Sequence, residues 1–408
     1  MINHSIYGGL VQLSGNKIEI EVVNDDVKGE SPRALLKATS STKEMPDGSL
    51  VESIPGGPFI DPKVWSIQPD GSGKAIFDFS EYFDAPVDYG FTFPAGNEIA
   101  VKHPLRSFDL NILAGCSYIE NDIASAEFGD KKELWQAPGN AVAIRILKGG
   151  MSQDRQASYN ESGLNFYQDY IQGNKFLTHR PNFQRISYNQ PVRLWYLLPG
   201  TIQVVRSLIV EYTAADNSVT ALTFPVTLDP DGLYEFILDP SMLGVPADAK
   251  QFKVYQSDGV TQVGESRTFV IDHQYFENNT FLFFANSLSG IDDVWFTGAV
   301  KLSLNSEGET GLQTLDRTAT TRDRSVVVTK KTASRKWSIF PGNRLNASDI
   351  EAIQDLIYSK FIWLVWNGRI VPVNLESSEF ELTDTMSDLF INDQLELVFT
   401  EAHKNNHY

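Results

Sequence analysis

The stretch TFLFFANSLSGIDDVWFTG, residues 280–298, decides how the C-terminal third of the chain is interpreted. Two apolar runs flank a polar segment that could either line a cleft or turn the chain between two strands. Phe281 and Phe283 alternate with Leu282 and Phe284, so the first run is typical of a strand buried on both faces. The run DVWFTGAVKLSL continues as a second strand. The residues between them are therefore predicted to form the turn of a hairpin rather than an active site: Asn286, Ser287, Ser289, Gly290 and Asp292.

The same two-residue period dominates the rest of the chain. In NKIEIEVVND, residues 16–25, Ile18, Ile20 and Val22 alternate with charged residues, as in a half-buried strand. Dipeptides that favour tight turns recur between the apolar runs: Asp47-Gly48, Asp70-Gly71, Asp231-Gly232, Asp258-Gly259 and Asn367-Gly368. This density of turns predicts a mainly β protein made of tandem β-sandwich domains.

Three regions differ in pattern. Residues 1–185 are predicted to form an N-terminal β-rich domain, in which AVAIRIL, residues 141–147, is a central strand. The polar and aromatic segment 149–170 is expected to be a long loop or short helix at an edge. Residues 186–275 contain six strand-like runs at the spacing of an immunoglobulin-like β-sandwich: VRLWYLL, SLIVEYTA, VTALTFPVTL, LYEFIL, FKVYQSDG and SRTFVID.

Residues 276–408 are predicted to form a β-sandwich with one packed helix. The segment LNASDIEAIQDLIYS has a capping box, Ser348 with Glu351, followed by a stripe of isoleucine and leucine. A hairpin follows, in which FIWLVW and RIVPVNL flank Asn367-Gly368. Pro372 cannot donate a backbone hydrogen bond, so its strand is expected near an edge or a bulge. His403 and His407 lie in a tail that is expected to fray.

Composition excludes several classes of protein. The formal charge of -18 over 408 residues disfavours sequence-specific or wrapping contacts with nucleic acid, which need a high density of cations. No apolar run approaches the length of a membrane span, and residues 1–15 lack the features of a secretory signal. The single cysteine, Cys116, rules out disulfides within the chain, and we expect synthesis in a reducing cytoplasm.

Motifs of known chemistry are missing from the sequence. The histidines are scattered without ligand spacing, and neither a nucleophile elbow nor a phosphate-binding loop is present. Asp229 and Asp231 lie in an Asp-Pro-Asp-Gly turn sequence, which lacks the rest of a calcium loop. The sequence therefore predicts no catalytic, cofactor-binding or metal-binding residues and no cofactor, although paired carboxylates distant in sequence leave a glycan-cleaving enzyme as a less favoured alternative.

One segment has the opposite charge to the whole. Residues 316–344 contain eight cations and two anions, a net charge of +6 in a chain of -18. A solvated hairpin or loop, a patch that docks on an acidic surface of a neighbouring copy, and a nucleic-acid contact are all compatible with it. The candidate subunit-interface patch comprises Arg317, Arg322, Arg324, Lys330, Lys331, Arg335, Lys336 and Arg344.

Phrases in the second half carry a resemblance. FLTHRPNFQRISYNQPVRLWYLL, residues 176–198, and the stretch 280–298 resemble segments of structural tail proteins from tailed phages and prophages of Bacteroidetes. The order of the closing helix, the strand pair ending in VPVNL, and LELVFTEAHKN is similar to the β-sandwich-plus-helix domain of tail-tube and distal-tail proteins. The resemblance covers roughly residues 176–408. It implies a virion protein, made in the host cytoplasm, that forms a ring in the tail or baseplate and has no enzymatic activity.

We therefore expect a non-enzymatic, homo-oligomeric structural protein with other virion tail proteins as partners. The alternative is a virion module that binds carbohydrate or a receptor, such as a host surface glycan. Its candidate contact residues are aromatic residues of the first region: Trp65, Tyr82, Tyr89 and Trp135.

Overall fold

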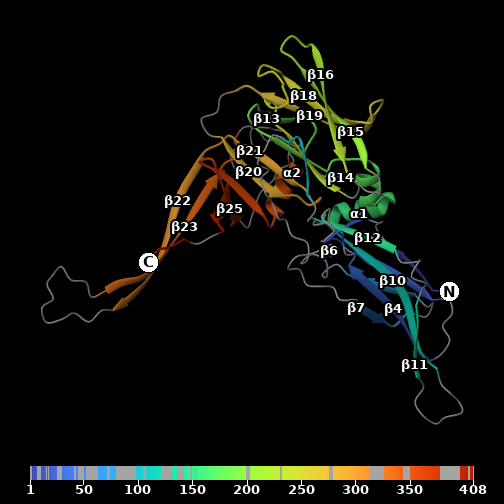
Figure 1. The fold of residues 1–408 in the computed structure, drawn as a ribbon. Helices are drawn as coiled ribbons and strands as arrows, with labels where there is room; N and C mark the ends of the chain where they lie inside the picture. The colour runs from blue at the N-terminus through green and yellow to red at the C-terminus, as the bar shows by residue number, and fades with distance from the viewer. Residues whose placement is uncertain are drawn as a thin grey trace.

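The protein is mainly β, as the sequence predicts (Figure 1). The computed structural model describes residues 2–6, 11–14, 16, 18–24, 30–40, 43–44, 50–51, 63–70, 74–79, 98–103, 107–120, 130–135, 142–147, 149–151, 153–198, 203–229, 232–274, 279–312, 326–342, 350–376, 396–402 and 405–407. Within these residues the helical elements are α1 (Gln153–Ser162), the π-helical turn η3 (Tyr167–Gln172) and α2 (Ile350–Tyr358).

The N-terminal region contains three sheets. The first has the order β1 (Ile2–Ile6), β3 (Glu19–Asn24), β8 (Lys74–Asp78). The second has the order β2 (Val11–Leu13), β12 (Val142–Leu147), β10 (Ser107–Glu120), β4 (Glu30–Ser40), β7 (Lys63–Ile67), with β11 (Asp130–Trp135) paired to β10. The third is a small hairpin of β5 (Lys43–Glu44) and β6 (Leu50–Val51). The alternation around β3 is confirmed, because Ile18, Ile20 and Val22 are fully buried.

Two sheets in the middle of the chain face each other across one core. One has the order β13 (Gln184–Ser187), β19 (Gln262–Asp272), β18 (Gln251–Ser257), β15 (Val204–Thr213), β16 (Val219–Leu228). The other has the order β14 (Val192–Leu198), β17 (Gly232–Leu238), β9 (Ala100–Lys102). All six predicted strands of this region are confirmed, and alternate residues of both sheets fill the shared core. The immunoglobulin-like description and the domain limits stay predictions, and β9 shows that residues 100–102 pair with this region.

The C-terminal sheet has eight strands and encloses its own core. Its order is β21 (Ile291–Phe296), β20 (Thr280–Ala285), β24 (Ile362–Trp366), β25 (Arg369–Leu375), β26 (Leu397–Glu401), β23 (Val326–Ile339), β22 (Val300–Leu312), with β27 (Asn405–His407) paired to β23. Helix α2 adds Ile353 and Leu356 to the core, so the predicted apolar stripe is confirmed. The capping residue Ser348 lies outside the described residues.

The hairpin turn of this sheet is as predicted, whereas the position of Pro372 and the C-terminal tail correct the sequence analysis. Asn367 and Gly368 both have positive φ and close the hairpin of β24 and β25, as expected. Pro372, however, lies on an interior strand: its carbonyl accepts a hydrogen bond from the Ala402 amide, and the ladder with β26 begins one residue later at Val373. The backbone donor that Pro372 lacks is therefore missing only at the end of the ladder between β25 and β26. The tail was predicted to fray, but its residues Asn405–His407 form strand β27, which pairs with β23.

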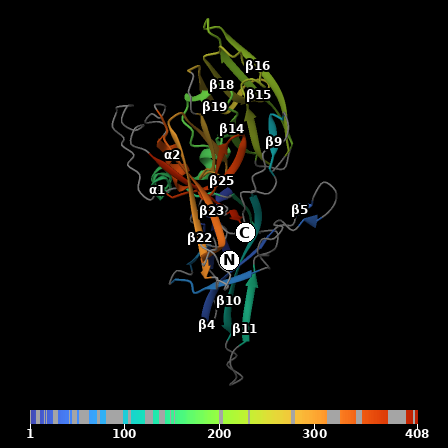
Figure 2. The same ribbon diagram turned by 90° about the vertical axis from the view of Figure 1, so that its left-hand side faces the viewer.

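Strands β22 and β23 form a long antiparallel pair, called the arm below, to which β26 and β27 add on the β23 side. Strands β22 and β23 pair over their whole length, from Val300 opposite Ile339 to Leu312 opposite Val326. Figure 2 shows the arm extending away from α2 and the body of its sheet. The outer strand, β22, is the last in the sheet order and so presents an open edge.

A third apolar cluster, called the central core, joins all three regions. Its buried members are Leu13, Leu147, Met151, Phe166, Tyr170, Ile171, Leu177, Trp195, Leu197, Leu233, Phe283, Leu288 and Ile291. Strand β14 connects it to the core between the middle sheets, because Trp195 and Leu197 point into one and Leu194 and Tyr196 into the other. The short helix predicted within residues 149–170 is confirmed as α1, but the predicted edge position is wrong for Phe166 and Tyr170, which are buried in the centre.

Candidate functional site

The loop of the opening stretch lies at the central core. The hairpin of β20 and β21 is confirmed, and residues 286–290 connect its strands. Asn286 is fully buried; its side-chain oxygen accepts hydrogen bonds from the Leu288 and Gly290 amides, and its amide group donates to the Leu177 carbonyl at 2.9 Å. A Cβ added to Gly290 would lie 2.7 Å from that same carbonyl oxygen, so only glycine fits. The loop is thus fitted tightly against residues more than 100 positions earlier.

Asp292 does not form part of the turn, contrary to the sequence analysis. It lies on β21, fully buried, and pairs with a fully buried arginine, Arg180. The Arg180 Nε donates to Asp292 Oδ1 at 3.2 Å, and another guanidinium nitrogen forms an ion pair with Asp293. Because both carboxylates are removed from water, they require these charged partners.

Neutral donors complete this arginine cluster. Asp292 also accepts hydrogen bonds from Thr178 and Asn286, and Asp293 accepts one from Gln190. Burial raises the pKa of Asp292, and the donors around it, Arg180 first among them, oppose that rise. The two aspartates raise the pKa of Arg180 against the effect of its own burial. The cluster fastens the segment before β13 to β21.

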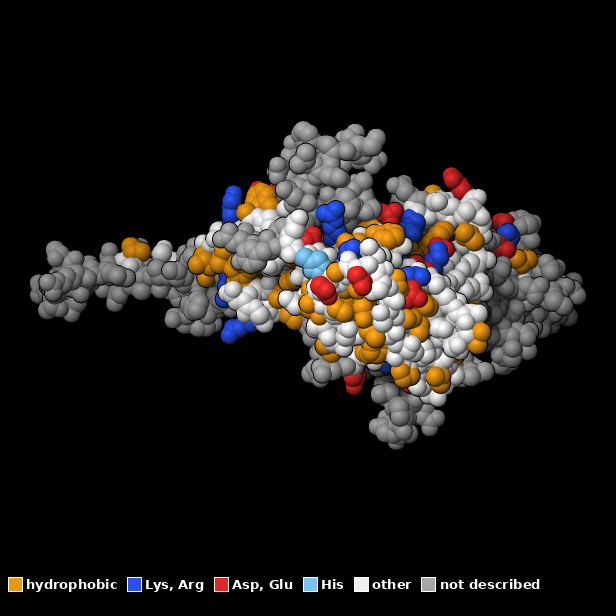
Figure 3. Space-filling view, turned by 90° about the horizontal axis from the view of Figure 1, so that it is seen from above, with side chains coloured by type: hydrophobic (Ala, Val, Ile, Leu, Met, Phe, Trp, Pro, Cys, Tyr) orange, Lys and Arg blue, Asp and Glu red, His pale blue; other side chains and the backbone are white. Residues whose placement is uncertain are grey.

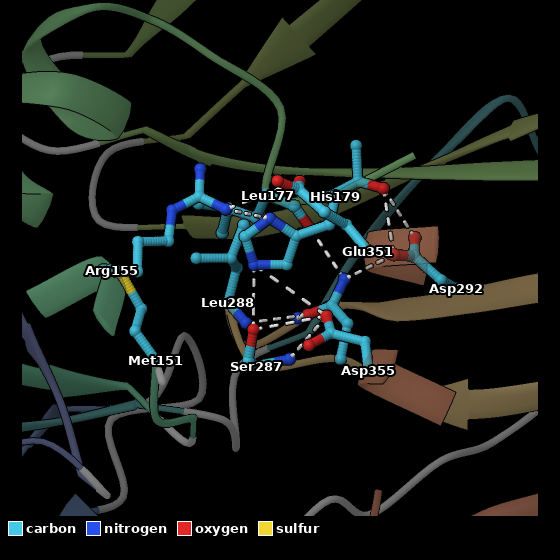
Figure 4. A network of polar contacts seen from close by, with 12 residues as sticks. Met151, Arg155, Leu177, His179, Ser287, Leu288, Asp292, Glu351 and Asp355 are labelled. Carbon is cyan, nitrogen blue, oxygen red and sulfur yellow. Dashed lines mark hydrogen bonds and ion pairs between the residues drawn. The ribbon is translucent and has the colours of Figure 1, made fainter. Parts of the chain in front are cut away.

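A second chain of polar contacts runs beside the arginine cluster. Figure 4 shows the imidazole of His179 between Arg155 of α1 and Ser287 of the loop, with Asp355 of α2 beyond. Arg155 lies 2.6 Å from Nδ1 of His179, and Ser287 Oγ lies 2.8 Å from Nε2. Asp355 Oδ2 accepts from the Ser287 amide at 3.3 Å and from its hydroxyl at 3.2 Å. Three separate elements meet in this His179 chain.

Serine, histidine and aspartate in one network suggest nucleophilic catalysis, but the order of contacts opposes it. In a catalytic triad the aspartate holds the Nδ1 proton, which leaves Nε2 free to accept the serine proton. Here a guanidinium, which can only donate, occupies Nδ1. The proton of a neutral His179 must therefore reside on Nε2, which donates toward Ser287 rather than activating it.

The charges of this chain are strongly perturbed. Burial, reinforced by the positive charges of Arg155 and Arg267, lowers the pKa of His179 to about 3. Burial also raises the pKa of Asp355 to about 7, with a contribution from the negative charge of Asp292. A histidine that stays neutral down to acid pH is a poor proton acceptor, so the arrangement suits a structural role.

A third polar cluster fixes the other side of the central core. Glu235 of β17 is fully buried, pairs with Arg193 of β14 and lies 2.8 Å from His103 Nε2. Against the effect of burial, the hydrogen bond from His103 and the charge of Arg193 lower the pKa of Glu235. The Arg193 guanidinium also lies 5.3 Å from the ring centre of Phe283, so this cluster reaches the opening stretch as well.

The predicted interface patch is only partly described. Lys330, Lys331, Arg335 and Lys336 lie on β23, while Arg317, Arg322, Arg324 and Arg344 lie outside the described residues. Arg335 is exposed, and no ion pair joins it to another described residue. Lys336 pairs with Glu376 at 2.8 Å. The role of the patch stays a prediction.

The side chains of the aromatic residues predicted for glycan contact lie outside the described part of the chain. Trp65 and Trp135 lie on β7 and β11, whose side chains at these positions are outside the description, as are Tyr82 and Tyr89. In the described part of the chain no group of three or more metal-ligating side chains forms, and no helix there is long and apolar enough to cross a membrane.

The sequence analysis missed the partners in all three polar clusters. A signal was present for two of the clusters, which have charges inside otherwise apolar strands: Asp292 in GIDDVWF for the arginine cluster, and Arg193 in VRLWYLL with Glu235 in LYEFIL for the third cluster. A charge in a strand buried on both faces must meet an opposite charge. The pattern predicts that partners exist, but it does not say which residues they are.

Comparison with known proteins adds little. No protein-family model matches the sequence, and no curated protein matches it. Among solved structures, a chain from a chaperone–tip adhesin complex of CFA/I fimbriae biogenesis is similar over 66% of this chain and 98% of its own length. The identity is 10% and the TM-score 0.19, values at which the likeness carries no argument about fold or function.

Proposed function

We propose that the chain is a non-enzymatic structural subunit of a phage tail or baseplate, which assembles with other copies through its C-terminal sheet. The observation that carries the proposal is the arm, which extends the open edge of that sheet away from the body. Tandem sandwich modules, as the resemblance implies, would supply the rest of the subunit surface.

The arm continues the core face of its sheet without a cover. Val300 packs against the core opposite the buried Ile339. Leu302, opposite the fully buried Trp337, is 46% exposed, and Leu304, opposite the exposed Arg335, is 70% exposed. Along this face of the arm, the apolar side chains are therefore packed against the core at Val300 and exposed to solvent at Leu304. Figure 3 shows orange hydrophobic side chains where the projection on its left joins the body. Such a surface favours a protein partner.

The two long edge strands of the described sheets differ in their protection. Pro225 interrupts β16, which removes one backbone donor from that edge. Strand β22 has 13 residues and no proline, with a register shift between Glu309 and Thr310. No described strand pairs with its outer side, so an edge of this length suits pairing with a strand of another molecule.

Charge supports a second copy as the partner. The segment 316–344 carries +6, so the remainder of the chain carries -24. A basic arm and an acidic body attract each other between copies, whereas two bodies repel. Head-to-tail contacts of this kind close into rings when the rotation permits.

The polar clusters also fit a structural subunit. They hold α1, the residue 176–183 segment, the loop of residues 286–290 and α2 to one another with buried charges. A subunit that transmits force along an assembly needs its modules to keep a fixed arrangement. At His179, Arg155 contacts Nδ1 and Ser287 contacts Nε2, and this arrangement supports a structural use over hydrolysis.

Electron microscopy tests the proposal at two levels. Purified protein should form closed assemblies in which β22 contacts a neighbouring copy. Virions from a phage that encodes the chain should contain it in the tail, as detected by mass spectrometry of purified particles and by density fitting. A stable monomer that is absent from particles would refute the proposal.

A further inference from the structure

We propose that folding moves one proton within the His179 chain, from the imidazole of His179 to the carboxyl group of Asp355. The folded joint between α1, the loop of residues 286–290 and α2 is then a neutral relay of hydrogen bonds in mildly acidic solution. It becomes a buried carboxylate only near neutral pH and above.

The contacts of His179 require the neutral imidazole. Both of its ring nitrogens have partners: Arg155 at Nδ1 and Ser287 at Nε2. A guanidinium has no lone pair to accept a hydrogen bond, so Nδ1 must be unprotonated for the 2.6 Å contact with Arg155. An imidazolium would place two positive groups against each other, with His179 only 6% exposed.

The burial of Asp355 favours the protonated carboxyl group, against two hydrogen bonds from Ser287 that favour the carboxylate. The Asp355 side chain is 15% exposed and lies 3.8 Å from His179 Nε2. The nearby cations are engaged elsewhere: Arg180 pairs with Asp292 and Asp293, and Arg155 contacts His179, Tyr170 and Glu351. Within the described residues no Arg or Lys side chain pairs directly with Asp355, and the charge of Arg155 only partly offsets the effect of burial.

The electrostatics of the surrounding elements agree with this assignment. The groups that face the pair are Arg155 from α1, Arg267 from β19, Asp292 from β21 and Glu351 from α2. Burial first, then Arg155 and Arg267, lowers the pKa of His179 from 6.5 to about 3. Burial first, with Asp292 contributing, raises the pKa of Asp355 from 3.8 to about 7. Burial and third residues cause each shift, so each shift should survive replacement of the other residue.

The two shifts have opposite consequences for stability. The raised pKa of Asp355 gives stability that is present at low pH and is lost as pH rises from about 4 to about 7. The lowered pKa of His179 gives stability that is present above about pH 6.5 and is lost as pH falls toward 3. Between about pH 4 and 6.5 the unfolded pair holds one proton on histidine and the folded pair holds one on aspartate, so the two slopes cancel.

Two single variants separate the contributions of Asp355 and His179 to the pH dependence of stability. Asp355→Asn mimics the neutral carboxyl group, and His179→Gln retains an acceptor toward Arg155 and a donor toward Ser287. Relative to wild type, D355N should gain stability as pH rises from 4 to 6.5, by up to about tenfold in the folding equilibrium constant per pH unit. H179Q should lose stability over the same range by a similar factor, and the double variant should follow the wild-type profile.

The measurement is chemical denaturation at half-unit steps of pH. Glu351→Gln, which removes a 70% exposed carboxylate from the same helix, is the matched control and should follow wild type. Parallel profiles for wild type, D355N and H179Q would overturn the proposal.

A measurement on the wild-type protein covers the case in which a variant does not fold. Nitrogen chemical shifts of His179 at pH 5 should report a neutral imidazole with its proton on Nε2. The carboxyl carbon shift of Asp355 should titrate near pH 7. An imidazolium signal at pH 5 would refute the assignment whatever the variants do.

Discussion

The joint and the arm use charge and apolar surface in opposite ways. At the joint, defined by the arginine cluster and the His179 chain, Arg180 is fully buried and each carboxylate has donors from a distant part of the chain. On the arm, Arg335 is exposed and Leu304 projects into solvent. Buried charges that are paired within the chain indicate a role inside the subunit. Exposed apolar and charged side chains, as on the arm, indicate a surface that binds another molecule.

The largest effect is expected from Arg180→Met. The change leaves Asp292 and Asp293 buried without their cation, which should cost about 3–5 kcal/mol of unfolding free energy. Urea denaturation monitored by tryptophan fluorescence measures it.

The control for this prediction is Arg335→Met on the arm. An exposed arginine that forms no ion pair with another described residue should contribute within about 0.5 kcal/mol. Equal losses in the two variants would remove the distinction between joint and arm.

Gly290→Ala should have the next largest effect. The added Cβ would lie 2.7 Å from the Leu177 carbonyl oxygen and 2.9 Å from Trp195 Cδ1, so backbone must shift. We expect a loss of about 2–3 kcal/mol in the same denaturation experiment.

Gly368→Ala serves as the comparison for Gly290. Its Cβ would meet nothing within 4 Å, and its positive φ alone should cost about 1 kcal/mol. If Gly290→Ala were the milder change, the loop of residues 286–290 would not be held as tightly as its contacts indicate.

A smaller effect is expected from raising the salt concentration, which should weaken assembly. Attraction between the basic arm and an acidic neighbouring body is screened as ionic strength rises, because the Debye length falls from about 10 Å at 0.1 M to about 3 Å at 1 M. Assembly followed by light scattering should weaken severalfold over this range, while the unfolding midpoint changes little. Assembly that strengthens with salt would indicate a purely apolar contact.

The elements of the fold were predictable wherever the pattern is local. Alternation in 192–198 and 204–213 predicts strands β14 and β15, and Asn367-Gly368 predicts the hairpin of β24 and β25. These patterns depend on neighbouring residues, so the sequence contains the whole signal.

The joint was not predictable because its partners are distant in sequence. Arg180 meets Asp292 across 112 positions, and His179 meets Ser287 across 108. Segment 149–170 was misplaced for the same reason: its polar residues suggest an edge, while Phe166 and Tyr170 are buried by strands from other regions. A single sequence shows that a buried charge needs a partner without showing which one.

Sedimentation equilibrium of wild type, Leu304→Glu and Val205→Glu tests the central claim most directly. Leu304 and Val205 are 70% and 68% exposed, but only Leu304 lies on the arm. Burying a leucine contributes roughly 1.5–3 kcal/mol, so a charge at Leu304 should abolish association at micromolar protein. We predict assemblies for wild type and V205E and a folded monomer for L304E. Identical sedimentation of all three proteins would contradict an assembly built on the arm.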